Sequence, residues 1–187
     1  MSVKIMLRNV RLSFEHVFTP SAFDEGQTPK YSATFIIPKH HADLDKVKAA
    51  FHAAGVDKYP NSFKGTEWPK GFTCSLKDAD TQTDSMGEVL AEKNPAYAGC
   101  YILEANSTRR PVVVGRRKEA LTAEDGVIYS GCYVNASLAA APYEYGKVKR
   151  GVKAYLNGVQ FVKDGERFGT DALSDFDDLE DDDDFTN

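Results

Sequence analysis

The sequence predicts a mainly β domain, built as a small closed barrel or an α+β sandwich, followed by a disordered acidic tail. Several segments alternate apolar and polar residues with the period of a β-strand, and one segment has the period of a helix. Acidic residues crowd the C-terminal end. A length of 187 residues suits one globular domain. We expect that domain over residues 1–170 and the tail over 171–187.

The first part of the chain predicts two strands and a helix. Residues 3–14 alternate with a change of phase at Asn9, which predicts a strand with a bulge. Apolar residues at the odd positions of 31–37 predict a second strand. Apolar residues at helical spacing between Asp43 and Gly55 predict a short amphipathic helix that Gly55 ends as a C-cap.

The remainder predicts loops and further strands. Between residues 55 and 95, glycines, prolines and polar residues interrupt the pattern, and only 71–76 alternates, so we expect loops around one strand. Four more segments have the pattern of strands: 97–105, 110–115, 126–138 and 151–163. Gly158 allows a bulge in the last of them.

Charge divides the chain in two. Residues 171–187 hold nine acidic residues and no basic one, whereas the preceding 170 residues hold 23 basic and 19 acidic ones. A block of like charges repels itself and buries little apolar surface, so it is expected to stay disordered and available for interaction. The sequence therefore predicts a basic body with an acidic tail.

Several function classes are disfavoured. The phosphate-binding, dinucleotide-binding, nucleophile-elbow and zinc-protease motifs do not occur, so we expect no enzyme, no cofactor and no small-molecule substrate. The three cysteines have no Cys-x-x-Cys spacing, and two of the four histidines are adjacent in a turn, so we expect neither disulfides nor a metal site. No apolar stretch is long enough for a membrane span, and we expect a protein of a reducing cytoplasm.

Two strands are predicted to present tyrosines outward. In 126–138 the apolar residues take the even positions, which leaves Tyr129 and Tyr133 on the other face. In 151–157 the same alternation puts Lys153 and Tyr155 on the face opposite the apolar residues. Basic residues cluster nearby in the sequence, at Arg109, Arg110, Arg116, Arg117, Lys118, Lys149 and Arg150. Aromatic rings stack on bases and cations neutralise phosphates, so the combination indicates a nucleic-acid groove.

Each feature also has a purely structural interpretation. Tyrosines on strands commonly pack against neighbours, and arginine clusters often only solvate a face. The tail favours the functional interpretation, since an acidic segment with isolated apolar residues competes with nucleic acid for a basic groove. The tail residues expected to contact partners are Phe176, Asp181, Asp182, Asp183, Asp184 and Phe185.

The sequence resembles the single-stranded DNA-binding proteins of tailed phages. The resemblance rests on Gly-Cys-Tyr-Val-Asn-Ala at 131–136, Lys-Arg-Gly-Val at 149–152, Leu-Asn-Gly-Val-Gln at 156–160 and Asp-Gly-Glu-Arg-Phe-Gly at 164–169. It is similar to members from phages of enteric bacteria, such as an Enterobacter phage. The resemblance implies an OB-fold barrel that coats single-stranded DNA in the host bacterial cytoplasm, and a tail that contacts replication proteins such as polymerase or helicase. In related proteins the tail ends in an aromatic residue, whereas here Thr186 and Asn187 follow Phe185.

Two other functions remain open from the sequence. A strand-annealing recombination protein would share the basic groove and the tyrosines. A phage assembly protein would use the acidic tail to dock a basic partner. An enzyme is the least favoured class, because no acid, base and nucleophile converge in the sequence.

Overall fold

The computed structural model describes residues 1–22, 24–146 and 148–169. In chain order its elements are β1 (Val3–Ser21), β2 (Lys30–Pro38), α1 (Leu44–Lys58), β3 (Phe72–Cys74), β4 (Leu76–Asp78), α2 (Leu90–Lys93), a 3-10 turn (Pro95–Tyr97), β5 (Cys100–Ser107), β6 (Val112–Val114), a second 3-10 turn (Ala123–Asp125), β7 (Tyr133–Tyr145) and β8 (Lys149–Lys163). In this part of the chain, no helix has the length and apolar character that a membrane span requires.

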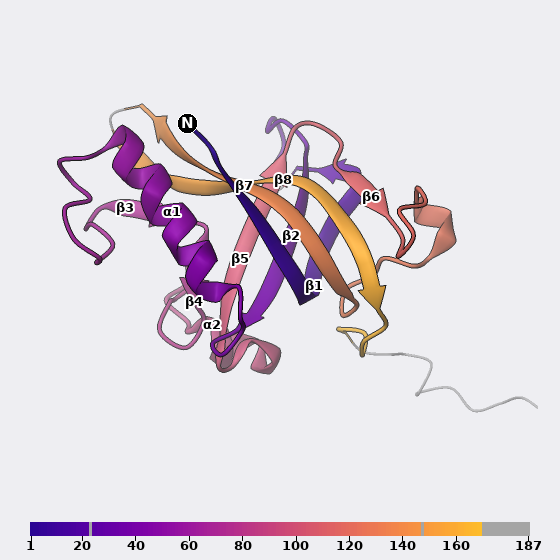
Figure 1. The fold of residues 1–187 in the computed structure, drawn as a ribbon. Helices are drawn as coiled ribbons and strands as arrows, with labels where there is room; N and C mark the ends of the chain where they lie inside the picture. Colours follow the sequence, from indigo (N-terminus) through magenta and orange to yellow (C-terminus); the bar gives the residue numbers. More distant parts are fainter. Residues whose placement is uncertain (23, 147, 170–187) are drawn as a thin grey trace, which may run out of the picture.

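Five of the strands close into a barrel (Figure 1). β1 pairs with β2 and β7, β2 pairs with β5, and β7 pairs with β8, all antiparallel. The parallel pairing of β5 with β8, at Ala105–Ala154 and Asn106–Tyr155, closes the ring. This is the strand order of an OB-fold, so the predicted mainly β barrel is confirmed.

A bulge lets β1 serve two neighbours. Leu7 and Val10 are both buried, and the register against β7 shifts between them. Asn9 takes a left-handed conformation there, with φ of 52°. Beyond Arg11 the strand leaves β7 and continues along β2 alone. The bulge predicted at Asn9 is therefore confirmed, and it bends one long strand around the barrel.

β8 has three different neighbours along its second edge. Residues 150–152 pair with β3, residues 154–155 with β5, and residues 158–160 with β6. Two of the contacts need glycine, because a Cβ on Gly151 would overlap the backbone of Thr73 and one on Gly158 would lie 2.8 Å from the Val112 carbonyl oxygen. The register against β7 shifts between Leu156 and Gly158, where the sequence predicts a bulge.

Helix α1 covers one end of the barrel, against β1, β7 and β8 (Figure 1). Its buried face includes Leu44, Val47 and Phe51, as the helical spacing predicts. The predicted C-cap at Gly55 is wrong, because the helix continues to Lys58. Gly55 is buried, and a Cβ there would overlap the Phe63 ring, so this glycine serves a close contact rather than a helix end.

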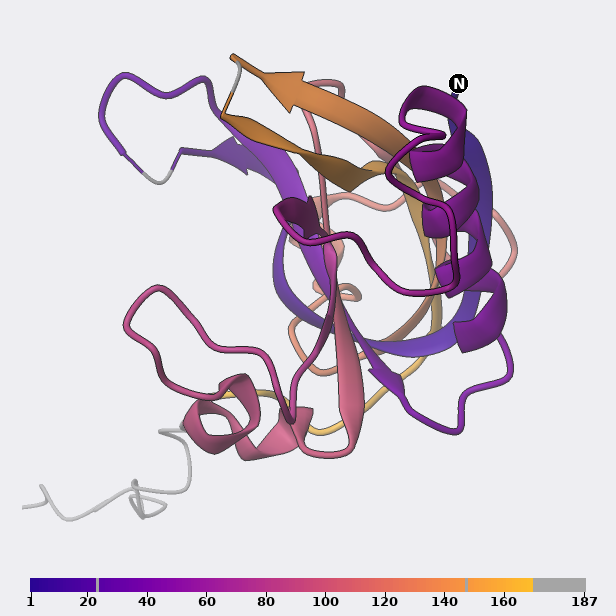
Figure 2. The same cartoon turned by 90° about the vertical axis from the view of Figure 1, so that its left-hand side faces the viewer.

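A second, smaller apolar cluster lies outside the barrel. Ile36 of β2 and Ile102 of β5 point outward and are covered by Ala79 and Tyr97 from the segment between β4 and β5. That segment contains α2 and the first 3-10 turn, where the sequence predicts loops. Figures 1 and 2 show it at the end of β2 and β5 remote from the β1–β2 and β7–β8 turns.

The strand predicted over 126–138 is displaced in the structure. It begins only at Tyr133 and runs to Tyr145. Two turn glycines with positive φ interrupt the preceding residues, Gly126 at 62° and Gly131 at 114°. Ile128 is buried although it is not in a strand. Because it is apolar, it fits the alternation of β7, and the predicted strand therefore begins too early.

Candidate functional site

Alternate residues of β8 separate the barrel interior from its outer face. Val152, Ala154 and Leu156 are buried inside, as the alternation predicts. Lys153 and Tyr155 lie on the outer face, with the Lys153 ammonium 4.7 Å from the centre of the Tyr155 ring. Lys149 also has an odd number in this alternation, so it lies on the same face, and it is exposed. One face of β8 thus presents an aromatic ring next to two cations.

The strand registers extend this face into a row across four strands. Tyr155 of β8 pairs with Asn106 of β5, Asn106 pairs with Ser32 of β2, and Ser32 pairs with His16 of β1. Directly paired residues project from the same face of a sheet, so the four side chains form one continuous row. We call His16, Ser32, Asn106 and Tyr155 the outer row.

The outer row lies on the outer surface of the barrel, where its side chains are accessible. Residues next to it in each strand, such as Ala33, Ala105 and Ala154, are buried in the barrel, while His16 is exposed and the rest of the row is half-buried. The β1–β2 and β7–β8 turns lie on one end of this face, and the cluster around Tyr97 covers the other end (Figure 2).

Tyr143 of β7 joins this face, although it was not among the predicted site residues. Its hydroxyl is hydrogen-bonded to the Thr73 hydroxyl of β3, and the Lys153 ammonium lies 5.5 Å from the centre of its ring. The alternation of β7 continues through Ala139 and Ala141 to Tyr143, so extending the pattern past residue 138 would have found it.

Arg150 lies apart from Lys149 and Lys153, although the three were predicted as one group. It pairs with Phe72 on β3, and its guanidinium carbon lies 4.4 Å from the centre of the Phe72 ring. Phe72 packs edge-on against Tyr59 and Phe63. Neighbouring residues of a strand point to opposite faces, so Arg150 lies on the helix side of β8.

The other basic candidates lie farther along β8. Arg109 and Arg110 precede β6, and Arg116, Arg117 and Lys118 follow it; all five are exposed. β6 separates the two groups as predicted, and it pairs with β8 at 158–160. In the turn after β6, Glu119 accepts a hydrogen bond from the Arg117 backbone N–H at 2.8 Å, so a carboxylate lies within this basic cluster.

Tyr129 and Tyr133 lie near the far end of β8. Tyr133 pairs with Lys163, whose ammonium is 4.7 Å from the centre of the tyrosine ring. Lys163 is eight residues from Tyr155 along β8, which corresponds to roughly 25 Å. The structure therefore does not bring Tyr133 together with Tyr155.

Tyr129 holds the segment after β8. Its hydroxyl lies 2.9 Å from a carboxylate oxygen of Asp164 and accepts a hydrogen bond from the Gly165 backbone N–H at 3.0 Å. The Arg167 guanidinium covers one face of the ring at 4.1 Å. Burial raises the pKa of the Tyr129 hydroxyl, which stays protonated as a hydrogen-bond donor. The ring also packs against the core of the barrel.

The cysteines are free and lie in apolar surroundings. Burial raises the pKa of Cys74 to about 11 and also raises the pKa of Cys100 and Cys132. All three thiols are therefore neutral near pH 7, and a neutral thiol is a poor nucleophile and metal ligand. Within residues 1–22, 24–146 and 148–169, no three His, Cys, Asp or Glu side chains gather as they would around a metal ion.

The predicted tail contacts lie outside the described residues. They are Phe176, Asp181, Asp182, Asp183, Asp184 and Phe185.

Comparison with known proteins relates the chain to phage proteins. The family model described as "Enterobacter phage Enc34, ssDNA-binding protein" matches residues 3–186. "Putative protein p50" of Acyrthosiphon pisum secondary endosymbiont phage 1 is 38% identical over 189 residues, covering 95% of this chain and 94% of that protein.

Solved structures show the same relationship. The single-stranded DNA-binding protein of bacteriophage Enc34 in complex with ssDNA matches with a TM-score of 0.73 and 26% identity, over 89% of each chain. The single-stranded DNA-binding protein gp2.5 of bacteriophage T7 matches with a TM-score of 0.57 and 14% identity over 97% of each chain, which shows a shared fold. The family model matches nearly the whole length of this chain, so the chain belongs to the Enc34 ssDNA-binding protein family.

Proposed function

We propose that this protein binds single-stranded DNA without sequence preference, along the outer row. The observation that carries the proposal is the similarity, over 89% of each chain, to an Enc34 protein whose structure was solved with ssDNA. OB-folds bind oligonucleotides on the outer face of their second and third barrel strands and on the adjoining loops. Here those strands are β2 and β5, which contribute Ser32 and Asn106 to the row.

The chemistry of the row suits this ligand. The Tyr155 ring offers a stacking surface to any base, and Lys149 and Lys153 offer cations to the phosphates. Asn106 and Ser32 add hydrogen-bond donors and acceptors between them. The arginines around β6 and the tyrosines at the far end of β8 would extend the contact along a longer strand. Coating of this kind requires no catalytic group.

The biological role follows from this binding. The protein coats and protects ssDNA during phage DNA replication and recombination in the cytoplasm of the host bacterium. Its acidic tail contacts phage or host replication proteins such as polymerase or helicase. Phe176 and Phe185 supply apolar anchors among the carboxylates of residues 181–184.

The test is a titration of the full-length protein against a labelled mixed-sequence oligonucleotide, as single strand and as duplex, at several salt concentrations. Tight, salt-sensitive binding to the single strand alone supports the proposal. Equal binding to both forms, or none, contradicts it and favours the assembly protein. Pairing of complementary strands in an annealing assay would favour the recombination protein.

Changing Tyr155 to Ala is expected to weaken ssDNA binding by about 1–3 kcal/mol, the usual contribution of one stacked base. The salt dependence should change little, because no cation is lost. Tyr155→Phe is the matched control and should retain the affinity, since it keeps the ring. Titrations of the two variants, with thermal melts to verify folding, measure the difference. Equal affinity of the Ala and Phe variants would remove Tyr155 from the site.

Deletion of residues 171–187 is expected to tighten ssDNA binding, most clearly at low salt. The nine carboxylates of this segment compete with DNA phosphates for the same cations. Their field reaches about 30 Å at 0.01 M salt but only about 8 Å at 0.15 M. Phe176→Ser with Phe185→Ser, which keeps the charges, is the control. Unchanged affinity of the truncated protein at every salt concentration would contradict the competition.

A further inference from the structure

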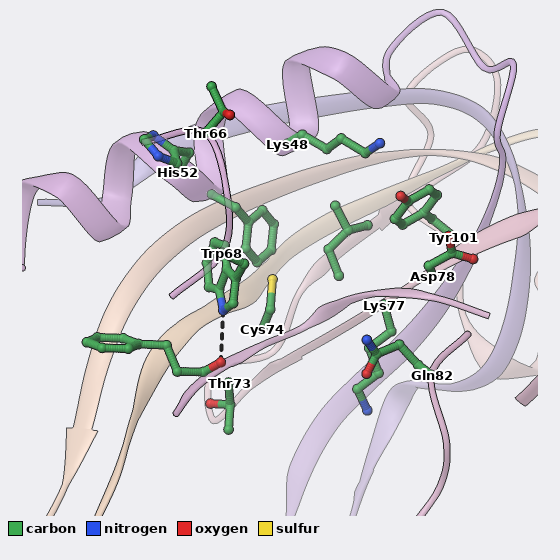
Figure 3. A pocket seen from close by; sticks show the side chains of 13 residues that line it. Lys48, His52, Thr66, Trp68, Thr73, Cys74, Lys77, Asp78, Gln82 and Tyr101 are labelled. Atoms are coloured by element: carbon green, nitrogen blue, oxygen red, sulfur yellow. Dashed lines mark hydrogen bonds between the residues drawn. The ribbon is translucent and has the colours of Figure 1, made fainter. Parts of the chain in front are cut away.

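A cavity of about 620 Å³ lies between α1, residues 66–78 and β5 (Figure 3). Cavities of about 300–1,000 Å³ commonly hold small organic ligands. Its walls combine aromatic rings, cations and uncharged polar groups. None of the four residues of the outer row lines this cavity.

The apolar wall presents a fixed aromatic plane. The Trp68 indole N–H donates a hydrogen bond to the Phe72 carbonyl oxygen at 2.8 Å, and its ring packs edge-on against Phe63. Phe51 and the neutral thiol of Cys74 complete this wall. The hydrogen bond and the packing hold the indole in place before a ligand arrives, which reduces the entropy lost on binding.

The opposite wall carries cations and polar groups. The Lys48 ammonium lies 4.3 Å from the centre of the Tyr101 ring. Gln82 offers an amide donor and acceptor. The one carboxylate in the lining, Asp78, is 3.0 Å from the Lys39 ammonium, and hydrogen bonds to Asp80 and Asp78 raise the pKa of Lys39. Because Lys39 also lies 2.6 Å from Asp80, it offsets the charge of Asp78 only in part. The cation of this wall that is left for an anionic ligand is Lys48, whose ammonium contacts the Tyr101 ring.

The cavity adjoins the proposed DNA face. Residues 72–78 form the wall between them, because β3 pairs with β8 and β4 pairs with β5. Thr73 lines the cavity and is hydrogen-bonded to Tyr143 on the outer face. Lys77 lines it as well and forms an ion pair of 3.1 Å with Glu104, which lies two residues from Asn106 of the outer row. The outer row and the cavity thus share one short wall, and Thr73 and Lys77 border both of them.

We propose that this cavity takes one unstacked nucleotide of a bound single strand, with its base against Trp68 and its phosphate at Lys48 and Lys77. The proposal rests on the proposed ssDNA-binding function. The Trp68 ring suits the face of a base, the Gln82 amide suits its hydrogen-bonding edge, and Lys48 and Lys77 suit the phosphate. An acidic peptide with an aromatic residue would match the cations and the aromatic wall, but it lacks the continuity with the outer row.

Photo-crosslinking separates this proposal from the function on which it rests. The full-length protein is irradiated with an oligonucleotide in which 5-iodouracil replaces thymine, and the adducts are mapped by mass spectrometry. We expect adducts on Trp68 or Tyr101 as well as on Tyr155. Adducts on Tyr155 without any on Trp68 or Tyr101 would overturn the cavity and leave DNA binding intact. An absence of both DNA binding and adducts would overturn both.

A matched pair of lysines on α1 gives a second test. Lys48→Ala should lower the slope of log affinity against log salt by about 0.7, the value for one phosphate contact on a single strand. Lys46→Ala removes an exposed lysine of the same helix that does not line the cavity, and its slope should stay at the wild-type value. Equal slopes for both variants would overturn the phosphate contact.

Trp68 is the only tryptophan, so its fluorescence reports on the cavity directly. Saturation of the full-length protein with an unlabelled oligonucleotide should quench this emission. Unchanged emission at saturation would overturn the proposal. If Phe185→Ser changes the Trp68 emission in the absence of DNA, and DNA itself causes no change, the tail occupies the cavity. That result would also overturn the proposal.

Discussion

Replacing Phe35 by Ala is expected to lower the free energy of unfolding by about 3–5 kcal/mol. Phe35 is fully buried at the centre of β2, where it pairs with Leu12 of β1 and Leu103 of β5. Both partners are also fully buried, so the ring fills the middle of the barrel. A closed barrel cannot collapse onto the space of a lost ring, since its strands are fixed by hydrogen bonds on both edges. The loss is large against a total stability of about 5–15 kcal/mol for a typical domain.

Urea denaturation followed by circular dichroism measures this change. The matched control is Phe14→Ala, which removes the same side chain from the neighbouring strand at a position that is 65% exposed. This variant should change the free energy of unfolding by at most about 0.5 kcal/mol. Similar losses for the two variants would mean that the interior of the barrel does not carry the stability.

The second large effect is expected at Gly131, where Ala should lower stability by about 2–6 kcal/mol. Gly131 has φ of 114°, a conformation that L-residues rarely adopt. A Cβ there would also overlap the carbonyl oxygen of Glu166. Backbone strain costs about 1–3 kcal/mol and overpacking about the same again.

The clash would fall on the segment that follows β8. Arg11 holds this segment to the barrel, since its guanidinium donates hydrogen bonds to the Gly131 carbonyl at 3.2 Å and to the Glu166 carbonyl at 2.6 Å. The same guanidinium stacks on Phe168 at 4.1 Å. Displacing Glu166 therefore breaks several contacts at once and should release residues 164–168.

Denaturant unfolding measures the loss at Gly131, and hydrogen exchange of residues 164–168 locates it. Gly146→Ala is the control, because Gly146 has φ of 60° and a Cβ there would meet nothing within 4 Å. Gly146→Ala should lower the free energy of unfolding only by the strain of the left-handed backbone, about 1–2 kcal/mol. If Gly131→Ala costs no more than this control, the close contact with Glu166 does not restrict the position.

Much of the barrel could be predicted from the sequence because it depends on local periodicity. Alternation along β8 places Val152, Ala154 and Leu156 inside and Lys153 and Tyr155 outside, whatever the neighbouring strands are. The phase change at Asn9 likewise marks the bulge of β1 without any tertiary information. The resemblance of residues 131–169 to phage proteins pointed to the family that the comparisons then showed.

The errors arise where a residue has two interpretations that only packing separates. Gly55 follows a helical pattern and so reads as a C-cap, yet it lies inside α1 because Phe63 packs against it. Ile128 fits the alternation of the following strand, but it is buried in the irregular segment that precedes β7. Glycine occurs both at helix ends and at close contacts, and apolar residues are buried both in strands and in irregular segments. Local sequence does not distinguish these cases.

Thus the sequence by itself determined the alternation of residues along β8, the mainly β character of the domain and the division into a basic body and an acidic tail. The alternation left a closed barrel and an α+β sandwich open, and the resemblance to phage proteins implied the barrel. Only the tertiary structure decided which of the outward residues meet. Tyr155 joins His16, Ser32 and Asn106 in one row, whereas Tyr133 lies roughly 25 Å along β8 and Arg150 on its other face. The physical reason is that the facing of a side chain depends on its own strand, while its neighbours depend on the register between strands distant in the chain.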